Sequence, residues 1–201
     1  MARFAPEPPR LYTLGRAVAL SPLPLAVRVA LRPALPADAA LLHRWRAEPA
    51  VRRHQPLQEA SVADLRADLA RQRPEDLYRG RGDRFQWLVL AESEPAGWIT
   101  LAVTSWEHAL AEVGYALTTP CHGRGLMAPA LHLLLADLFL STPIERLEAR
   151  CAVDNVASQR VLEKLGFRRE GLLRGYFALD GRRIDNFLYA LLRDDHLPPP
   201  G

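Results

Sequence analysis

A short turn of two glycines around an arginine is the stretch of sequence with the clearest chemical potential. Gly123, Arg124 and Gly125 stand directly before a strongly apolar segment that predicts a helix from Met127 to Leu140. Glycines let the backbone turn its N–H groups toward an anion, and the first N–H groups of a helix are unpaired and carry partial positive charge. Arg124 adds a charged donor. The turn therefore predicts a seat for a phosphate-bearing ligand, although Gly-x-Gly before a helix is also often a plain tight turn.

Two better known phosphate motifs do not fit this turn. The third glycine of a dinucleotide fingerprint is absent, because position 128 is Ala128, and no Gly-Lys-Ser/Thr of a P-loop follows. Pro129 suits the first turn of the predicted helix, where its missing N–H has no cost. The rest of the chain must decide between an anion site and a simple turn.

Composition narrows the classes of protein. The chain has 201 residues and a net charge of +3, which fits one mildly basic domain. Neither a dense basic stripe with aromatics nor an apolar run of about 20 residues occurs, so we expect no nucleic-acid or membrane partner. Cys121 and Cys151 predict free thiols in the cytoplasm, and the six histidines lack metal-ligand spacing, so no metal is predicted.

The elements that must position the turn alternate between helix and strand. After a strand that starts at Val27, one helix is predicted from Pro36 and a second from Ser61 to about Arg71, where Asp64 completes a near capping box with Ser61. A later predicted helix ends at Gly166, which stands at the C′ position of that helix. The predicted strands and helices that follow are the strands 85–91, 97–103 and 108–118, the helix 127–140, the strand 146–151, the helix 155–165, and the strands 167–179 and 182–192.

Smaller features complete this outline. Asp180 and Gly181 predict a type I′ hairpin between the last two strands, and Gly114 predicts a bulge or a close backbone approach. The segments 46–59 and 74–83 are predicted loops. Residues 1–26 are predicted as an extension with a possible extra edge strand, 27–194 as the domain and 195–201 as a flexible tail. The order indicates a mixed α/β sheet with the glycine turn at a strand end, where such sheets bind ligands.

Three stretches, Ala111–Leu117, Gly123–Met127 and Val153–Gly171, together resemble the GNAT acetyltransferases. More narrowly they resemble the Rim-type branch, which acetylates protein N-terminal amines. The resemblance implies an α/β GNAT fold. In that fold a mixed sheet of about seven strands is splayed between the fourth and fifth strands and flanked by about four helices.

The resemblance also implies acetyl-CoA as co-substrate and assigns residues to it. Its pyrophosphate would lie on the glycine turn, and its pantetheine arm along the preceding strand and near Asn155. Ser158 would lie close to the thioester sulfur, and His122 either reaches a phosphate or is a solvated loop residue. The cofactor-binding residues implied in this way are Tyr115, Ala116, Leu117, His122, Gly123, Arg124, Gly125, Leu126, Met127, Asn155 and Ser158.

The implied reaction is direct acetyl transfer to an amine in a ternary complex. An ammonium must first lose a proton, and Glu112 is the candidate base, directly or through a water; otherwise it is a solvated or ion-paired strand carboxylate. Ser158 is the candidate acid toward the leaving thiolate, or else a helix-capping residue. The candidate residues for the acceptor pocket are Trp45, Arg53, His54, Trp87, Trp106 and Tyr176, although an aromatic such as Trp87 equally suits the core.

The acceptor expected from the Rim-type resemblance is a protein N-terminal α-amine. A small amine, such as an antibiotic or a polyamine, is the alternative substrate, and a non-catalytic acyl-CoA-binding module is the alternative class. A homodimer is left open by the sequence.

Overall fold

A seven-stranded mixed sheet forms the centre of the protein. We describe residues 28–196 from a computed structural model of the chain. The strands lie in the order β1-β2-β3-β4-β5-β7-β6. All neighbours are antiparallel except β4 and β5, which are parallel. The strands are β1 Val29–Pro33, β2 Arg84–Ala91, β3 Glu94–Ser105, β4 Leu110–Leu117, β5 Arg146–Ala152, β6 Arg168–Leu179 and β7 Arg182–Leu192.

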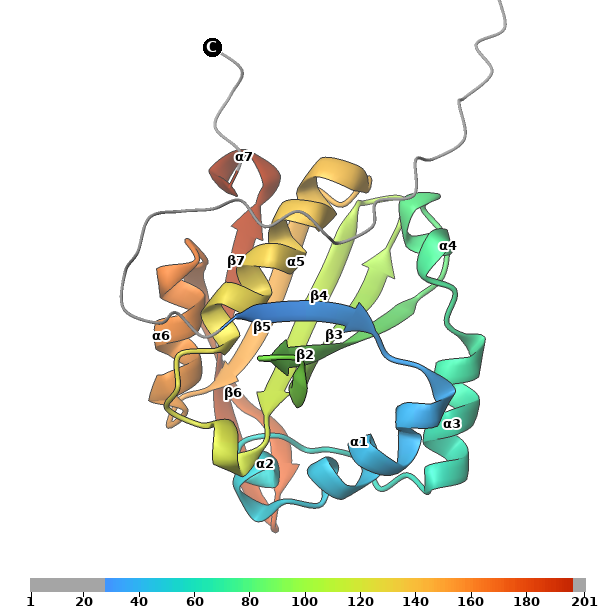
Figure 1. Ribbon diagram of the computed structural model, residues 1–201. Coiled ribbons are helices and arrows are strands. Elements are labelled where there is room, and N and C mark those ends of the chain that lie inside the picture. The colour runs from blue at the N-terminus through green and yellow to red at the C-terminus, as the bar shows by residue number, and fades with distance from the viewer. Residues whose placement is uncertain (1–27, 197–201) are drawn as a thin grey trace, which may run out of the picture.

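The helices connect these strands and cover parts of both faces of the sheet (Figure 1). Two 3₁₀ helices, η1 and η2, precede α1 and α5. Among the described residues no helix has both the length and the apolar character needed to cross a membrane. The helices are η1 Pro36–Asp38, α1 Ala39–Arg46, α2 Pro49–Arg52, α3 Val62–Arg71, α4 Pro74–Tyr78, η2 Thr119–Cys121, α5 Met127–Ser141, α6 Val156–Lys164 and α7 Arg193–His196.

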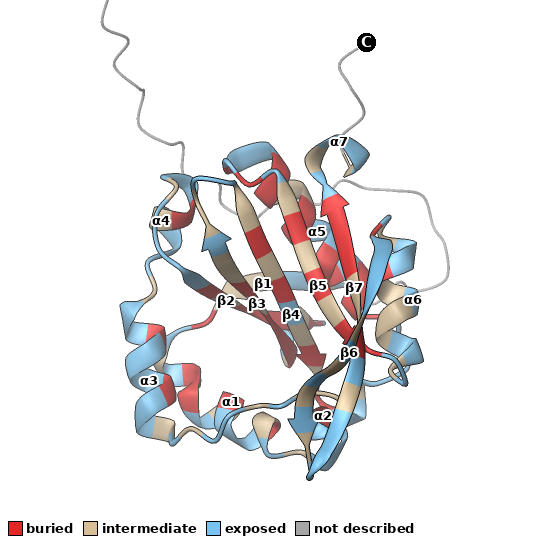
Figure 2. Ribbon diagram, turned by 180° about the vertical axis from the view of Figure 1, so that it is seen from behind, coloured by how far each residue is buried: buried red, intermediate tan, exposed pale blue. Residues whose placement is uncertain are grey.

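The two faces of the sheet differ in how they are covered. Helix α5 packs on one face, where alternate residues of β4 and β5, such as Val113 and Leu147, are buried with Leu131 and Leu135. Helices α1 and α3 pack on the other face near its β2–β3 end. Seen from behind in Figure 2, no helix lies over the upper part of β4, β5 and β7 on that second face, and no residue of β6 is buried. On this second face the side chains of Glu112 in β4 and Arg150 in β5 are partly exposed.

The parallel pairing of β4 and β5 is short. It runs from Leu110 opposite Arg146 to Glu112 opposite Glu148, and these are the last paired residues. Both strands continue beyond that point, β4 to Leu117 and β5 to its pairs with β7, so a gap opens in the middle of the sheet. The splay expected between the fourth and fifth strands is thus confirmed.

Several local predictions are confirmed by their backbone geometry. The Ser61 hydroxyl accepts from the Asp64 N–H at 3.1 Å and the Asp64 carboxylate accepts from the Ser61 N–H at 2.9 Å, which is the reciprocal capping box. Asp180 and Gly181 both have positive φ, 49° and 75°, as a type I′ turn requires. Pro129 lies in the first turn of α5 as expected.

Other local predictions are corrected by the structure. The predicted loops 46–59 and 74–83 contain the short helices α2 and α4, each with a proline as its first residue, where proline's fixed φ favours a helical start. Gly114 forms neither a bulge nor a close approach: it pairs regularly with Thr100, and no described atom lies within 4 Å of where its Cβ would stand. The predicted extension 1–26 and most of the tail 195–201 fall outside the described residues.

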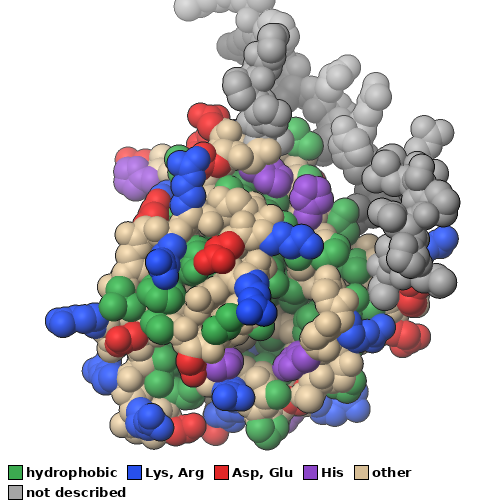
Figure 3. All heavy atoms as spheres, turned by 90° about the vertical axis from the view of Figure 1, so that its left-hand side faces the viewer, with side chains coloured by type: hydrophobic (Ala, Val, Ile, Leu, Met, Phe, Trp, Pro, Cys, Tyr) green, Lys and Arg blue, Asp and Glu red, His purple; other side chains and the backbone are tan. Residues whose placement is uncertain are grey.

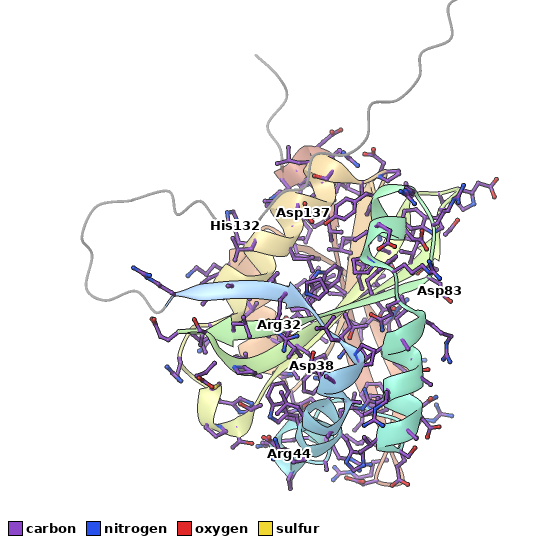
Figure 4. All side chains as sticks on the ribbon, turned by 45° about the vertical axis from the view of Figure 1, so that its right-hand side comes forward. Arg32, Asp38, Arg44, Asp83, His132 and Asp137 are labelled. Carbon is purple, nitrogen blue, oxygen red and sulfur yellow. The ribbon has the colours of Figure 1, made fainter. Side chains whose placement is uncertain are left out.

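An ion pair joins the first strand to the first helix. The Arg32 guanidinium donates to both Asp38 carboxylate oxygens, at 2.7 and 2.8 Å, and the Leu35 N–H donates to the same carboxylate at 2.7 Å (Figure 4). Asp38 is buried. The hydrogen bond from Arg32 is the main cause that lowers the pKa of Asp38, because it stabilises the charged form.

Replacing Asp38 should therefore destabilise the fold in a pH-dependent way. We expect Asp38→Asn to lower the free energy of unfolding by about 1.5–3 kcal/mol at pH 7, the range for hydrogen bonds to charged groups. Since the folded-state pKa is below the unfolded value of about 3.9, the wild-type advantage is complete above that value and shrinks as the pH falls through the folded-state pKa. Urea unfolding of both proteins from pH 7 to pH 3 measures the difference in their free energies of unfolding. A difference that is constant with pH would contradict the ion-pair explanation.

Candidate active site

The turn between β4 and α5 has the backbone that an anion site needs. Gly123 and Gly125 both have positive φ, 71° and 70°, a conformation that glycine adopts at little cost. No described atom lies within 4 Å of the position that a Cβ would take at either glycine, so the space beside the turn is open. Arg124 between them is exposed. Both glycines are thus required by conformation, and the exposed turn leaves room for a ligand.

The start of α5 presents unpaired backbone donors to that space. Leu126 is the N-cap, and among the described residues no side chain caps this helix end. The first turn contains no acidic residue, and the first backbone bond of the helix runs from Ala130 N–H to the Leu126 carbonyl. The N–H groups ahead of Ala130 and the helix dipole are therefore available to phosphate oxygens. Figure 3 views this side of the molecule, where basic side chains are interspersed with acidic ones.

The edge of β4 that faces the gap is contacted by two side chains. The Gln55 amide donates to the Tyr115 carbonyl at 3.0 Å, and His122 Nε2 lies 2.9 Å from the Leu117 carbonyl. Past Glu112, β4 has lost β5 as a hydrogen-bonding neighbour, and these side chains supply partners for its backbone. A pantetheine arm along this strand edge would compete with them. In particular, the predicted phosphate-contacting residue His122 is turned toward β4 here.

On the α6 side of the gap, Tyr115 and Ser158 are in direct contact. The Tyr115 hydroxyl lies 2.8 Å from Ser158 Oγ. Burial raises the pKa of Tyr115, so its hydroxyl keeps its proton at neutral pH and can donate to the serine. Asn155 is the N-cap of α6, and its Oδ1 accepts from the Ser158 N–H at 3.2 Å. Ser158 is thus held at both its backbone and its side chain.

On the opposite, open face, Glu112 is part of a group of charged side chains. It accepts a hydrogen bond from the Arg150 guanidinium of β5, which reaches across the gap. Arg150 also lies 3.5 Å from Glu148, and its guanidinium carbon is 5.4 Å from the centre of the Tyr176 ring. Glu112 is therefore ion-paired in this structure, which was one of the two interpretations left open by the sequence.

The structure brings together part of the predicted acceptor set. The Tyr176 ring contacts the Arg150 guanidinium, which in turn bonds to Glu112. His54 Nδ1 lies 3.1 Å from Oδ1 of Asp154, which follows β5. Trp45 lies on the α1 side but is buried, stacked on Trp98 at 6.3 Å.

Two predicted acceptor residues lie elsewhere. Trp87 is buried in the core on the α5 face, and its ring centre is 6.4 Å from that of Phe85. Trp106 lies beyond the opposite end of β4 from the gap and donates to the Gly82 carbonyl at 2.6 Å. Arg53 is exposed at the end of α2. Aromatic residue type alone therefore did not separate core positions from positions at the gap.

Three residues at the gap were not predicted. Arg150 follows Glu148 by two residues on β5, so both side chains lie on the same face of the strand. This period-2 pattern could have placed Arg150 near Glu112. Gln55 and Glu48, which accepts from the Thr119 N–H at 2.8 Å, come from a polar segment with no periodic signal.

Among residues 28–196 no cluster of His, Cys, Asp and Glu has the arrangement to hold a metal ion. Cys121 is half-buried and Cys151 is buried, and neither forms a disulfide within the described part of the chain.

A mixed sheet parted between two parallel strands, with a glycine turn and an uncapped helix at the parting, is the architecture of an acyl-CoA-dependent acyltransferase. The chain belongs to the GNAT acetyltransferases: the model for the acetyltransferase (GNAT) domain matches residues 28–168. The protein is thus an N-acetyltransferase, and acetyl-CoA is its co-substrate.

Relatives and solved structures agree with this family. An uncharacterized N-acetyltransferase p20 of Bacillus licheniformis is 28% identical over 84% of this chain and 95% of its own length. The ribosomal-protein-serine acetyltransferase of Escherichia coli is 31% identical over 57% of this chain and 64% of its own length.

Among solved structures, Mycobacterium smegmatis RimJ in complex with CoA-disulfide is 26% identical, with a TM-score of 0.71 over 86% of this chain and 85% of that one. A chimera of the spermidine N-acetyltransferase SpeG from Vibrio cholerae is 20% identical, with a TM-score of 0.71 over 85% of this chain and 98% of that one, and shares the fold. The fold is therefore shared by a RimJ bound to CoA-disulfide and by an enzyme named for spermidine.

The glycine turn yields a direct test of the cofactor site. We expect Gly125→Val to weaken acetyl-CoA binding at least about tenfold, because a branched side chain is strained at φ 70° and obstructs the backbone N–H groups. Gly181→Val is the matched control, with φ 75° and equally open surroundings but in the β6–β7 turn. Isothermal titration and thermal unfolding measure both variants. Equal loss of affinity in the two would show that strain alone, rather than the turn's contact with ligand, is responsible.

Proposed function

We propose that this enzyme transfers the acetyl group of acetyl-CoA to a protein N-terminal α-amine, by direct attack while both substrates are bound. The observation that carries this proposal is the placement of Glu112 and Ser158 on opposite sides of one gap. A carboxylate stands on the open face, where an acceptor can enter, and a hydroxyl stands on the α6 side, next to the route of the cofactor arm. The name of the Escherichia coli relative, an acetyltransferase of ribosomal-protein serine, supports this acceptor class.

Glu112 acts on the incoming amine. An α-amino group has a pKa near 8 and is mostly an ammonium at neutral pH, so it must lose a proton before it can attack. Glu112 takes that proton directly or through one water. Because Arg150 already bonds to Glu112, an entering ammonium shares the carboxylate with the guanidinium.

Ser158 and the backbone of β4 act on the other partner in the reaction. Acetyl-CoA supplies an activated acetyl group whose leaving group is a thiolate. The Ser158 hydroxyl, which the Tyr115 hydroxyl contacts at 2.8 Å, donates toward that thiolate. Backbone N–H groups of the segment 114–117 at the gap stabilise negative charge that develops on the acetyl oxygen. Tyr115 is a positioning residue in this scheme, since it acts through Ser158.

The role of Glu112 predicts a selective loss of turnover. We expect Glu112→Gln to lower kcat about 100-fold or more, the range for a general base, with little change in the Kd for acetyl-CoA. Glu148→Gln is the control, because Glu148 is the parallel neighbour of Glu112 on the same face and also faces Arg150. Steady-state thiol release and isothermal titration give the two numbers. An unchanged kcat in Glu112→Gln would refute the proposed base.

The acceptor class is tested by measuring which amines are acetylated. Wild-type enzyme with acetyl-CoA is offered a panel of peptides with free N-termini and a panel of alkylamines that includes a polyamine and an aminoglycoside. Thiol release and the mass of each product are measured. We expect N-terminally acetylated peptides as the best products. Preference for the small amines would assign the alternative substrate, and binding of acetyl-CoA with no acetylated product would indicate a non-catalytic module.

A further inference from the structure

Five charged side chains of alternating sign line the open face where β4 and β5 part. Two arginines stand among three glutamates, and their partners differ. Arg146 donates to Glu148 at 2.8 Å and to Glu170 at 2.6 Å, so it is held between two carboxylates. Arg150 bonds to Glu112 and lies 3.5 Å from Glu148. The cation nearest the proposed catalytic base is thus Arg150.

Arg150 is anchored without being saturated. It lies two residues beyond Glu148, the last paired residue of β5, and reaches back over the gap to β4. The Tyr176 ring supports its guanidinium at 5.4 Å. Its Nε is buried and has no hydrogen-bond partner among residues 28–196. A planar guanidinium has five N–H donors, so Arg150 can donate to a further oxygen while it stays on the tyrosine ring.

An acceptor that uses Glu112 must enter beside this cation. The reacting nitrogen arrives as an ammonium, and a second cation at Glu112 is opposed by Arg150 unless the guanidinium finds another oxygen. An α-amino acid residue brings such an oxygen, because its carbonyl is separated from the amine by one carbon atom. An alkylamine lacks that oxygen, and a polyamine brings further positive charge instead.

We propose that Arg150 is a specificity-determining residue that binds the carbonyl oxygen adjacent to the reacting amine while Glu112 binds the amine itself. The pair Glu112 and Arg150 thereby selects α-aminoacyl groups, such as peptide N-termini, over simple alkylamines and polyamines. This inference rests on the proposed function, because it requires amine acetylation at Glu112. It adds a physical reason for the choice of acceptor, namely that Arg150 binds a carbonyl oxygen which only the α-aminoacyl group has.

The test compares acceptors that differ in that carbonyl. Wild-type enzyme, Arg150→Gln and Arg150→Lys are assayed with an alanyl peptide, isopropylamine and spermidine, and kcat/KM is compared with the wild-type value for each acceptor separately. This comparison cancels the different amine pKa values. We expect Arg150→Gln to lower kcat/KM for the peptide about 10- to 100-fold, the value of a charge-assisted hydrogen bond. For isopropylamine and spermidine, which lack the carbonyl, kcat/KM should rise, because the cation that opposes a second positive charge at Glu112 has been removed. Arg150→Lys, which keeps the charge but loses the fork, should fall between.

Matched controls separate this role from a structural one. Arg146→Gln makes the same change of charge in the same group of side chains, and it should alter the peptide and the alkylamine equally. Acetyl-CoA binding and the thermal unfolding midpoint of each variant report on the fold. Equal losses for peptide and alkylamine in Arg150→Gln, or wild-type preference for spermidine, would overturn the inference while leaving amine acetylation established. Absence of any acetylated product from wild-type enzyme would instead overturn the proposed function, and the inference with it.

Discussion

The early end of the β4–β5 pairing is the constraint on which the rest of the site depends. A strand in the middle of a sheet normally satisfies its backbone groups on both sides. Here β4 loses its neighbour after Glu112 and continues to Leu117 with one edge open. That edge must find other partners, and it finds them in side chains from distant segments, such as Gln55 and His122. An extended ligand that paired with this edge would replace these side chains.

The gap has two faces with different physical supports. On the α5 face, buried apolar residues of β4 and β5 pack against the helix, and this packing holds the strands in position. On the other face the strands carry charged residues in place of apolar ones, because no described helix covers them there (Figure 2). Those charges pair with one another, which lowers the cost of their partial burial. One side of the gap is thus apolar and buried against α5, and the other is polar and partly exposed.

Segments near α2 connect the acceptor side to both edges of the gap. Glu48 bonds to the Thr119 backbone just after β4, Gln55 to the Tyr115 carbonyl within β4, and His54 to Asp154 just after β5. A ligand along β4 would compete with the Gln55 contact and therefore alter the segment that borders the acceptor side. In this geometry, a short segment that contains α2 contacts both edges of the gap.

Local chemistry made much of the fold and the conformation of the glycine turn predictable from the sequence. The capping box of Ser61 and Asp64, the positive-φ pair Asp180 and Gly181, and the glycine turn before α5 are each determined by residues next to one another in the chain. Hydrophobic periodicity predicted the main strands and helices, because it too is a pattern of residues close together in the chain. Resemblance to a family then supplied Asn155 and Ser158 as candidates, and the structure sets Ser158 against Tyr115.

The contacts across the gap depended on the tertiary structure. Arg150 and Glu112 are 38 residues apart in sequence, and Gln55 and Tyr115 are 60 apart, so neither pair leaves a local pattern. Trp87 and Tyr176 are both strand aromatics, yet one packs in the core and the other supports Arg150, because the sheet decides which face each occupies. The sequence by itself determined the main strands and helices and the glycine turn, since these follow from neighbouring residues. The fold alone decided which charges meet at the gap, since that depends on how distant strands lie side by side.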